Sequence, residues 1–224
     1  AGRAVGVGDD RGFDVNEPIL LLGNGINRAT HTQSWRGLVY NLSLLVNDPD
    51  VRRDLLSVEP GSLSLLLEVL VAQAELQERD VREKIAAYFS DGISPIYVEI
   101  SAIRGLSHIL TTNYDTHIEQ ALKRLDPGKR TVGRGSGKRE TKYNLFRRKQ
   151  VGSRSVWHIH GLAESPGSIQ LGFEHYSGQL GKIIQFRDQN THRFKKPVYS
   201  DGEAAWLEPF LWGDTHVLGL KSDP

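Results

Sequence analysis

Three short polar segments of this 224-residue chain combine residue types that can hold phosphates, orient water and accept protons. Glycines allow a backbone to approach a pyrophosphate closely, and the start of a following helix supplies favourable dipoles. Histidine titrates near working pH and therefore suits a general base. The segments are Gly23-Asn24-Gly25-Ile26-Asn27, Thr111-Thr112-Asn113-Tyr114-Asp115 and His158-Ile159-His160-Gly161.

Each segment taken alone also has a purely structural interpretation. The first lacks the spacing of the GxGxxG fingerprint and serves equally well as a tight turn from a strand to a helix. Asn113 and Asp115 are preferred residues at helix caps. His158 and His160 would point to one face of a strand, but further zinc ligands at a recognisable spacing are missing. The chain contains no cysteine either, so no zinc is expected.

The elements that must position these segments alternate between strand-like and helix-like patterns. Short apolar runs predict strands at 18–22, 108–112, 156–160, 168–172 and 215–220. Helices are predicted after Ser34, over 62–89, and after Thr116, which has the capping-box spacing to Glu119. This order predicts an α/β fold, a Rossmann-like, doubly wound, mainly parallel sheet with helices on both faces. In such sheets ligands bind beyond the carboxyl ends of the strands, where all three polar segments begin.

Charge is unevenly distributed along the chain, although the formal net charge is only +1. From Lys123 to Arg154 there are 12 Lys or Arg and 2 acidic residues, a local net charge of +10 against −9 elsewhere. We interpret residues 127–154 as an exposed basic insertion. We expect Lys123–Arg154 to make weak, non-specific nucleic-acid contacts or to dock against an acidic subunit.

The remaining composition indicates a cytoplasmic protein with no membrane segment, because no apolar run is long enough to span a bilayer and no signal-peptide pattern is present. Residues 1–17 are expected to form a flexible lead-in, and residues 18–224 a single domain. Methionine is absent and the chain stops directly after a strand-like run, so we expect the domain to be incomplete at its C-terminus.

The three polar segments, in this order, resemble the sirtuin family. Sirtuins have a glycine-rich turn after the first strand, a T-x-N-x-D segment after a later one, and a His-Gly pair after another. TTNYD, WHIHG, the basic stretch before WHIHG and the later SIQLGFEHY are most similar to the bacterial sirtuin-like domains of antiphage defence. Gly219-Leu220 resembles the family's final nucleotide-contacting turn, so the resemblance spans roughly residues 18–220 in patches.

The resemblance implies a role for each matching residue, with NAD as the substrate. Asn113 would position the attacking water or the ribose, Asp115 would hold the nicotinamide amide, and His160 would be the general base. Loss of nicotinamide builds positive charge on the ribose, and a water that attacks there needs a proton acceptor. The implied NAD-binding residues are Gly23, Asn24, Gly25, Ile26, Asn27, Thr112, Asp115 and Gly219.

Two departures from sirtuin deacylases disfavour peptide-substrate chemistry. The chain lacks the four-cysteine zinc module, and it lacks the GIPDFR stretch, although Arg36 follows Trp35 in a loosely similar place. The resemblance therefore implies an NAD hydrolase that depletes NAD in antiphage defence. An ADP-ribosyl transferase or deacylase and a non-catalytic NAD-binding assembly module are the alternatives. The implied partners are further copies of the chain and a HerA-type DNA-translocating ATPase or another defence-system subunit.

Overall fold

The computed structural model describes residues 17–29, 35–57, 63–73, 77–89, 93–128, 131–134, 142–194 and 204–220. Apart from Glu17, the predicted lead-in over 1–17 lies outside these residues. Within the described ranges, no helix is long and apolar enough to cross a membrane.

A single sheet of six strands organises the described part of the chain, in the order β3-β4-β5-β2-β1-β6. Strands β5, β2, β1 and β6 run parallel, whereas β3 and β4 form an antiparallel edge beside β5. This arrangement confirms the predicted α/β class with a mainly parallel sheet. The strands are β1 Pro18–Leu22, β2 His108–Thr111, β3 Thr131–Arg134, β4 Arg148–Val151, β5 Arg154–His158 and β6 Asp214–Leu218.

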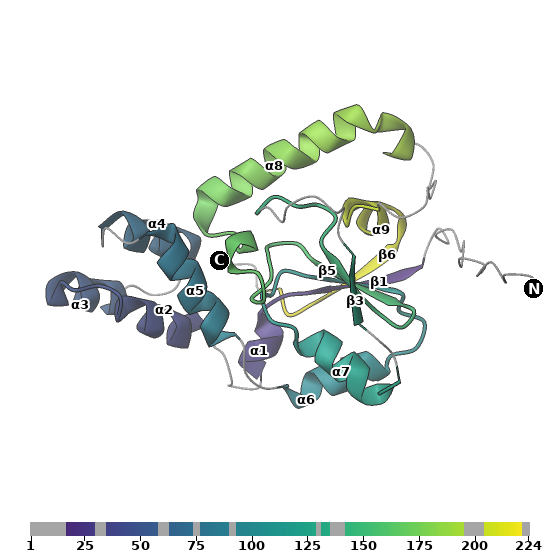
Figure 1. The fold of residues 1–224 in the computed structure, drawn as a ribbon, viewed down its shortest axis with the longest axis horizontal. Coiled ribbons are helices and arrows are strands. Elements are labelled where there is room, and N and C mark those ends of the chain that lie inside the picture. The colour runs from purple at the N-terminus through teal and green to yellow at the C-terminus, as the bar shows by residue number, and fades with distance from the viewer. Residues whose placement is uncertain are drawn as a thin grey trace, which may run out of the picture.

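The inner strands β1, β2 and β5 are largely buried on both faces, which explains why they read as continuous runs rather than as alternating patterns. Leu20 and Ile109 belong to the core under helices α6 (Pro95–Ala102) and α7 (His117–Leu125). Ile19, Leu110 and Trp157 belong to the core under α8 (Gly172–Gln189) and α9 (Leu207–Trp212). Figure 1 shows these two helix layers on opposite sides of the sheet. Successive residues of one strand therefore feed two different cores.

The remaining longer helices form a group beside the sheet, shown in blue and purple in Figure 1. They share an apolar cluster to which Tyr114 and Ile169 also belong. This helical group therefore packs against the segment after β2 and against the connection between β5 and α8. Two 3-10 turns, Pro166–Ser168 and Thr191–Phe194, flank α8. The other helices are α1 Gly25–Ala29, α2 Trp35–Ser43, α3 Pro49–Ser57, α4 Leu63–Gln73 and α5 Glu78–Tyr88.

The basic segment is not wholly an exposed insertion, so that prediction is wrong for residues 142–154. Strand β4 pairs with β5, and Leu145 and Arg147 are buried. The charge of Arg147 is tolerated because its Nη1 donates a hydrogen bond of 3.0 Å to the carbonyl of His158. Arg148 lies 5.0 Å from the centre of the Trp157 ring, a cation–π contact. Residues 129–130 and 135–141 lie outside the described ranges.

The prediction of a strand at 168–172 is also wrong. Residues 166–168 form a 3-10 turn, and α8 begins at Gly172, which has a φ of 68°. A five-residue apolar run does not distinguish a strand from a buried connection. The predicted strand at 156–160 ends earlier, at His158, so the same-face relation expected of His158 and His160 does not hold.

Candidate functional site

The three polar segments meet at one edge of the sheet, as the sequence predicts. Leu22 is in register with Thr111, and Thr111 with His158, so the three parallel strands end at the same level. Backbone bonds continue past the strand ends: the N–H of Thr112 donates to Leu22 at 3.0 Å, and that of Ile159 donates to Thr111 at 2.9 Å. Backbone hydrogen bonds therefore join the starts of the three segments.

The glycine-rich turn after β1 is pressed against the turn after β6. The N–H of Gly23 donates to Leu218 at 2.9 Å, and the N–H of Gly25 donates to Gly219 at 2.7 Å. A Cβ on Gly25 would lie 2.6 Å from the Gly219 oxygen, and Gly219 itself has a φ of 72°. These glycines are required for the close approach of two backbones, and both N–H groups are used in it. Their contact with NAD phosphates stays a prediction.

Asn27 connects this turn to the segment after β2. Its Nδ2 donates to Asp115 Oδ2 at 2.8 Å and to Asn24 Oδ1 at 2.9 Å. The other oxygen of Asp115 accepts from the N–H of His117 at 3.1 Å, at the start of α7. Asp115 is thus buried and engaged at both oxygens, which is the helix-start role of the structural interpretation. Its contact with nicotinamide stays a prediction.

Asn113 is buried beside the glycine turn with one atom unpaired. Its Nδ2 donates to the carbonyl of Gly23 at 3.3 Å and to the hydroxyl of Tyr97 at 3.0 Å. Its Oδ1 has no hydrogen-bond partner among the described residues. A buried acceptor left unsatisfied costs about 1–3 kcal/mol, so this oxygen is suited to accept from a hydroxyl group or water.

His158 is buried and contacts both Glu119 and the backbone of Asn113. Its Nε2 lies 2.6 Å from Glu119 Oε1, and its Nδ1 lies 3.4 Å from the Asn113 carbonyl. Burial raises the pKa of Glu119, but the contact with His158 outweighs this effect and the pKa is lowered. The predicted capping box is wrong, because Glu119 turns to His158 and Thr116 makes no side-chain cap bond. His158 thus lies between α7 and the backbone of Asn113.

His160 lies just beyond the end of β5 and is half-buried. Its ring is 4.9 Å from that of Tyr176 on α8. Burial lowers the pKa of its imidazole to about 4, so the ring is neutral at neutral pH and can accept a proton. The sequence-based expectation that it titrates near working pH is therefore wrong. Its carbonyl accepts from the N–H of Gln170, whose own carbonyl accepts from the Tyr114 hydroxyl.

Three residues of this network are not predicted by the sequence as part of the site: Tyr97, Glu119 and Tyr176. Tyr97 lies in the apolar sequence of α6, between Ile96 and Val98, and looks like a core residue. A buried tyrosine nevertheless needs a partner for its hydroxyl, and this is the only signal that the sequence offers.

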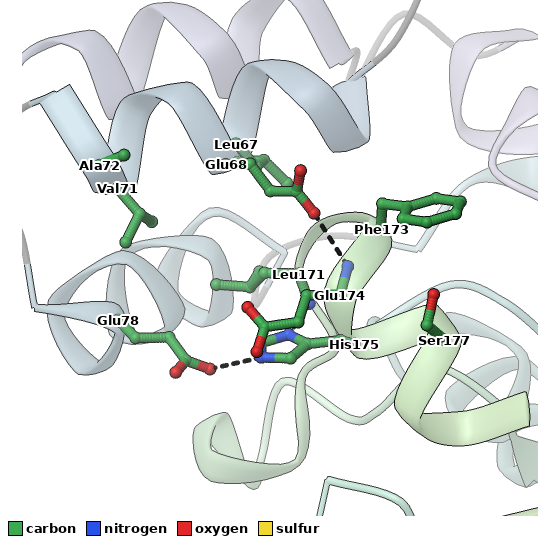
Figure 2. A pocket seen from close by; sticks show the side chains of 10 residues that line it. All are labelled: Leu67, Glu68, Val71, Ala72, Glu78, Leu171, Phe173, Glu174, His175 and Ser177. Atoms are coloured by element: carbon green, nitrogen blue, oxygen red, sulfur yellow. Dashed lines mark hydrogen bonds and ion pairs between the residues drawn. The ribbon is translucent and has the colours of Figure 1, made fainter. Parts of the chain in front are cut away.

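A cavity of about 620 Å³ opens away from these residues, between α4, α5 and the start of α8 (Figure 2). In it, His175 Nε2 lies 2.9 Å from Glu78 Oε1, and Glu68 accepts from the N–H of Glu174 at 2.9 Å. None of the predicted site residues lines this cavity. In the described ranges there is also no cluster of three or more His, Cys, Asp or Glu residues able to hold a metal ion.

Comparison with known proteins finds a family model that matches the central part of the chain. Residues 107–199 match the family model of the SIR2-like domain. The match covers β2, Asn113, α7, β5, His160 and the whole of α8, and it confirms the sirtuin-like resemblance over this stretch. It indicates NAD-dependent enzyme activity in general terms. No curated protein matches the chain.

Proposed function

We propose that this chain, with its SIR2-like stretch at 107–199, hydrolyses NAD to nicotinamide and ADP-ribose. The observation that supports it best is that the strands preceding three groups end at one sheet edge: Asn113 with an unpaired buried oxygen, His160 with a neutral ring, and the glycine turn. An acceptor that orients a hydroxyl group or water and a base that removes its proton are the two groups that hydrolysis of a glycosidic bond requires.

The proposed reaction breaks the bond between the nicotinamide nitrogen and C1 of the ribose. The bonding electrons leave with nicotinamide, which becomes neutral, and positive charge develops on the ribose. Water held by Asn113 Oδ1 forms the new bond to C1, and His160 accepts the proton that this water loses. The products are nicotinamide, ADP-ribose and one proton.

An ADP-ribosyl transferase would use the same cleavage with another acceptor in place of water, and it remains the second candidate. A deacylase is disfavoured because the chain has no cysteine for the zinc module of that class. From the resemblance alone we also propose that NAD depletion serves antiphage defence. On the same ground, we propose assembly with further copies of the chain or with a DNA-translocating ATPase.

Incubation of the purified protein with NAD and chromatography of the products separates these functions. We expect nicotinamide and free ADP-ribose in equal amounts, with both products formed much more slowly by Asn113→Ala. Nicotinamide without free ADP-ribose would indicate a transferase. NAD that is bound but remains intact would indicate the non-catalytic module and contradict the proposed function.

A further inference from the structure

Tyr97 connects the two asparagines of the sheet edge, although it lies on α6 and outside every motif considered above. Its hydroxyl donates to Asn27 Oδ1 at 2.8 Å and accepts from Asn113 Nδ2 at 3.0 Å. We propose that Tyr97 is a positioning residue that fixes the side-chain amide of Asn113, so that Oδ1 is the atom presented to the substrate. The role of that oxygen in catalysis rests on the proposed function.

The direction of every hydrogen bond in this chain of residues follows from one carboxylate. Ionised Asp115 can only accept, so the group of Asn27 that faces it must be the NH2 group. The same NH2 group also faces Asn24 Oδ1. A flipped Asn27 amide would place its oxygen against two acceptors, so only one orientation of Asn27 is satisfied.

The fixed Asn27 amide then sets the hydroxyl of Tyr97, and the hydroxyl sets Asn113. Asn27 Oδ1 needs a donor, and Tyr97 has a single proton to give. The hydroxyl oxygen can therefore only accept from Asn113, which must turn its NH2 group inward. The carbonyl of Gly23 favours the same orientation, but at the longer distance of 3.3 Å.

The surroundings of Tyr97 keep this hydroxyl protonated. The side chain is buried in the core between α6 and the sheet, and its ring lies 5.4 Å from that of His117. Burial, reinforced by the charge of Asp115, raises the pKa of the hydroxyl far above neutral. Tyr97 thus remains a donor to Asn27 across the physiological pH range.

The variant Tyr97→Phe removes only the hydroxyl and tests this assignment. We expect kcat for nicotinamide release to fall about 10- to 100-fold, because Asn113 keeps only its longer bond to Gly23, while KM for NAD changes little. A purely structural role would lower the melting temperature and leave kcat per folded molecule unchanged. Tyr40→Phe removes an exposed hydroxyl and is the matched control.

A double variant shows whether Tyr97 acts through Asn113. In the Asn113→Ala background, Tyr97→Phe should cause no further loss of activity, because the group that it positions is gone. Independent, multiplying losses would overturn the proposal. So would a folded Tyr97→Phe protein with the kcat of the wild type, and this result would leave NAD hydrolysis itself standing.

A readout without NAD separates failure of this proposal from failure of the proposed function. NMR spectra of isotope-labelled protein show the side-chain NH2 signals of asparagine. Those of Asn113 are identified by their loss in Asn113→Ala and are then compared between wild type and Tyr97→Phe. We expect them to shift and to exchange faster with solvent in the variant. If the wild type releases no nicotinamide, the hydrolase function fails, and unchanged Asn113 signals would then overturn the positioning role as well.

Discussion

If His160 is the general base, the rate of nicotinamide release should depend on pH differently from the rate of an enzyme whose base is an exposed histidine. Burial lowers the pKa of its imidazole from the ordinary value of 6.5 to about 4. Only the neutral ring can accept a proton, so the active form persists as the pH falls and is lost only near pH 4. We expect kcat/KM for nicotinamide release to stay level between pH 8 and about 5, and to halve near pH 4.

Circular dichroism at each pH provides the control that the protein remains folded. An acid limb centred near pH 6.5 in a folded protein would show that another histidine is the base, or that His160 is exposed in the working enzyme.

The two histidines of the third segment should respond differently to replacement by alanine. His158→Ala leaves the buried carboxylate of Glu119 without its partner, which should cost about 3–5 kcal/mol of unfolding free energy. His160→Ala removes only a ring contact with Tyr176, so its stability should stay near that of the wild type. Urea denaturation of both variants measures these two stabilities, and nicotinamide release measures their activities.

Among molecules that remain folded, we expect His160→Ala to be the more damaging to turnover. The reverse order of activity would mean that the base is wrongly assigned.

At the scale of elements, the packing of the β1 turn against the β6 turn holds the glycine segment in place. An alanine at Gly219 would combine a left-handed backbone with a Cβ 2.8 Å from the N atom of Ile26. Gly105 has a similar φ of 83°, but open space surrounds the position of its Cβ. Gly105→Ala should therefore cost about 1–2 kcal/mol from backbone strain alone.

Gly219→Ala should exceed that cost by about 1–3 kcal/mol because of overpacking, and it should also reduce NAD turnover. Thermal denaturation of both variants measures the difference. Equal destabilisation by the two substitutions would show that the turns yield readily and that their close packing matters little.

The elements that the sequence predicts well are those with a period or a long apolar run. Strand β1 spans 18–22 as predicted, and β2 and β6 differ by only a few residues at their ends. Their order along the chain and their shared parallel direction are enough to bring the three polar segments to one edge. The strand predicted at 168–172 is absent because these residues are buried in the connection to α8. Burial in such a connection does not require hydrogen-bonded pairing with a neighbouring strand.

Side-chain partners that depend on the approach of distant elements could not be predicted. The spacing of Thr116 and Glu119 predicts a capping box, but a buried histidine 39 residues away is the partner of Glu119. Tyr97 reaches Asn27 across 70 residues of sequence. Periodicity identifies which face of an element is buried, whereas these interactions depend on which polar atom lies opposite, and that requires the packed structure.

For the whole molecule, the segregation of charge predicts weak binding of polyanions. Several cations of the basic segment have structural partners, including Lys149 with Glu164 and Arg154 with the carbonyl of Ile103. Replacing Arg147 would therefore disturb the fold together with any binding. Lys123 and Arg124 are exposed in the last turn of α7 and are better targets.

We expect the double variant Lys123→Ser, Arg124→Ser to bind duplex DNA more weakly than the wild type. The slope of log affinity against log salt should become shallower by about 0.9 for each phosphate that the variant no longer neutralises. The pair Lys182→Ser, Arg187→Ser removes the same two residue types outside the segment and is the control. Equal affinities for all three proteins would show that Lys123 and Arg124 do not contribute to DNA binding.

The decisive test of NAD cleavage at this sheet edge is the rate of nicotinamide release from NAD. This rate is compared between wild type, His160→Ala and His192→Ala. His192 is an exposed histidine in the turn after α8, so its replacement should leave the rate unchanged. The wild type should release nicotinamide, and His160→Ala should be slower by about 100- to 10,000-fold while remaining folded. No release by the wild type, or an unchanged rate in a folded His160→Ala protein, would contradict the assignment of this sheet edge as the site of NAD cleavage.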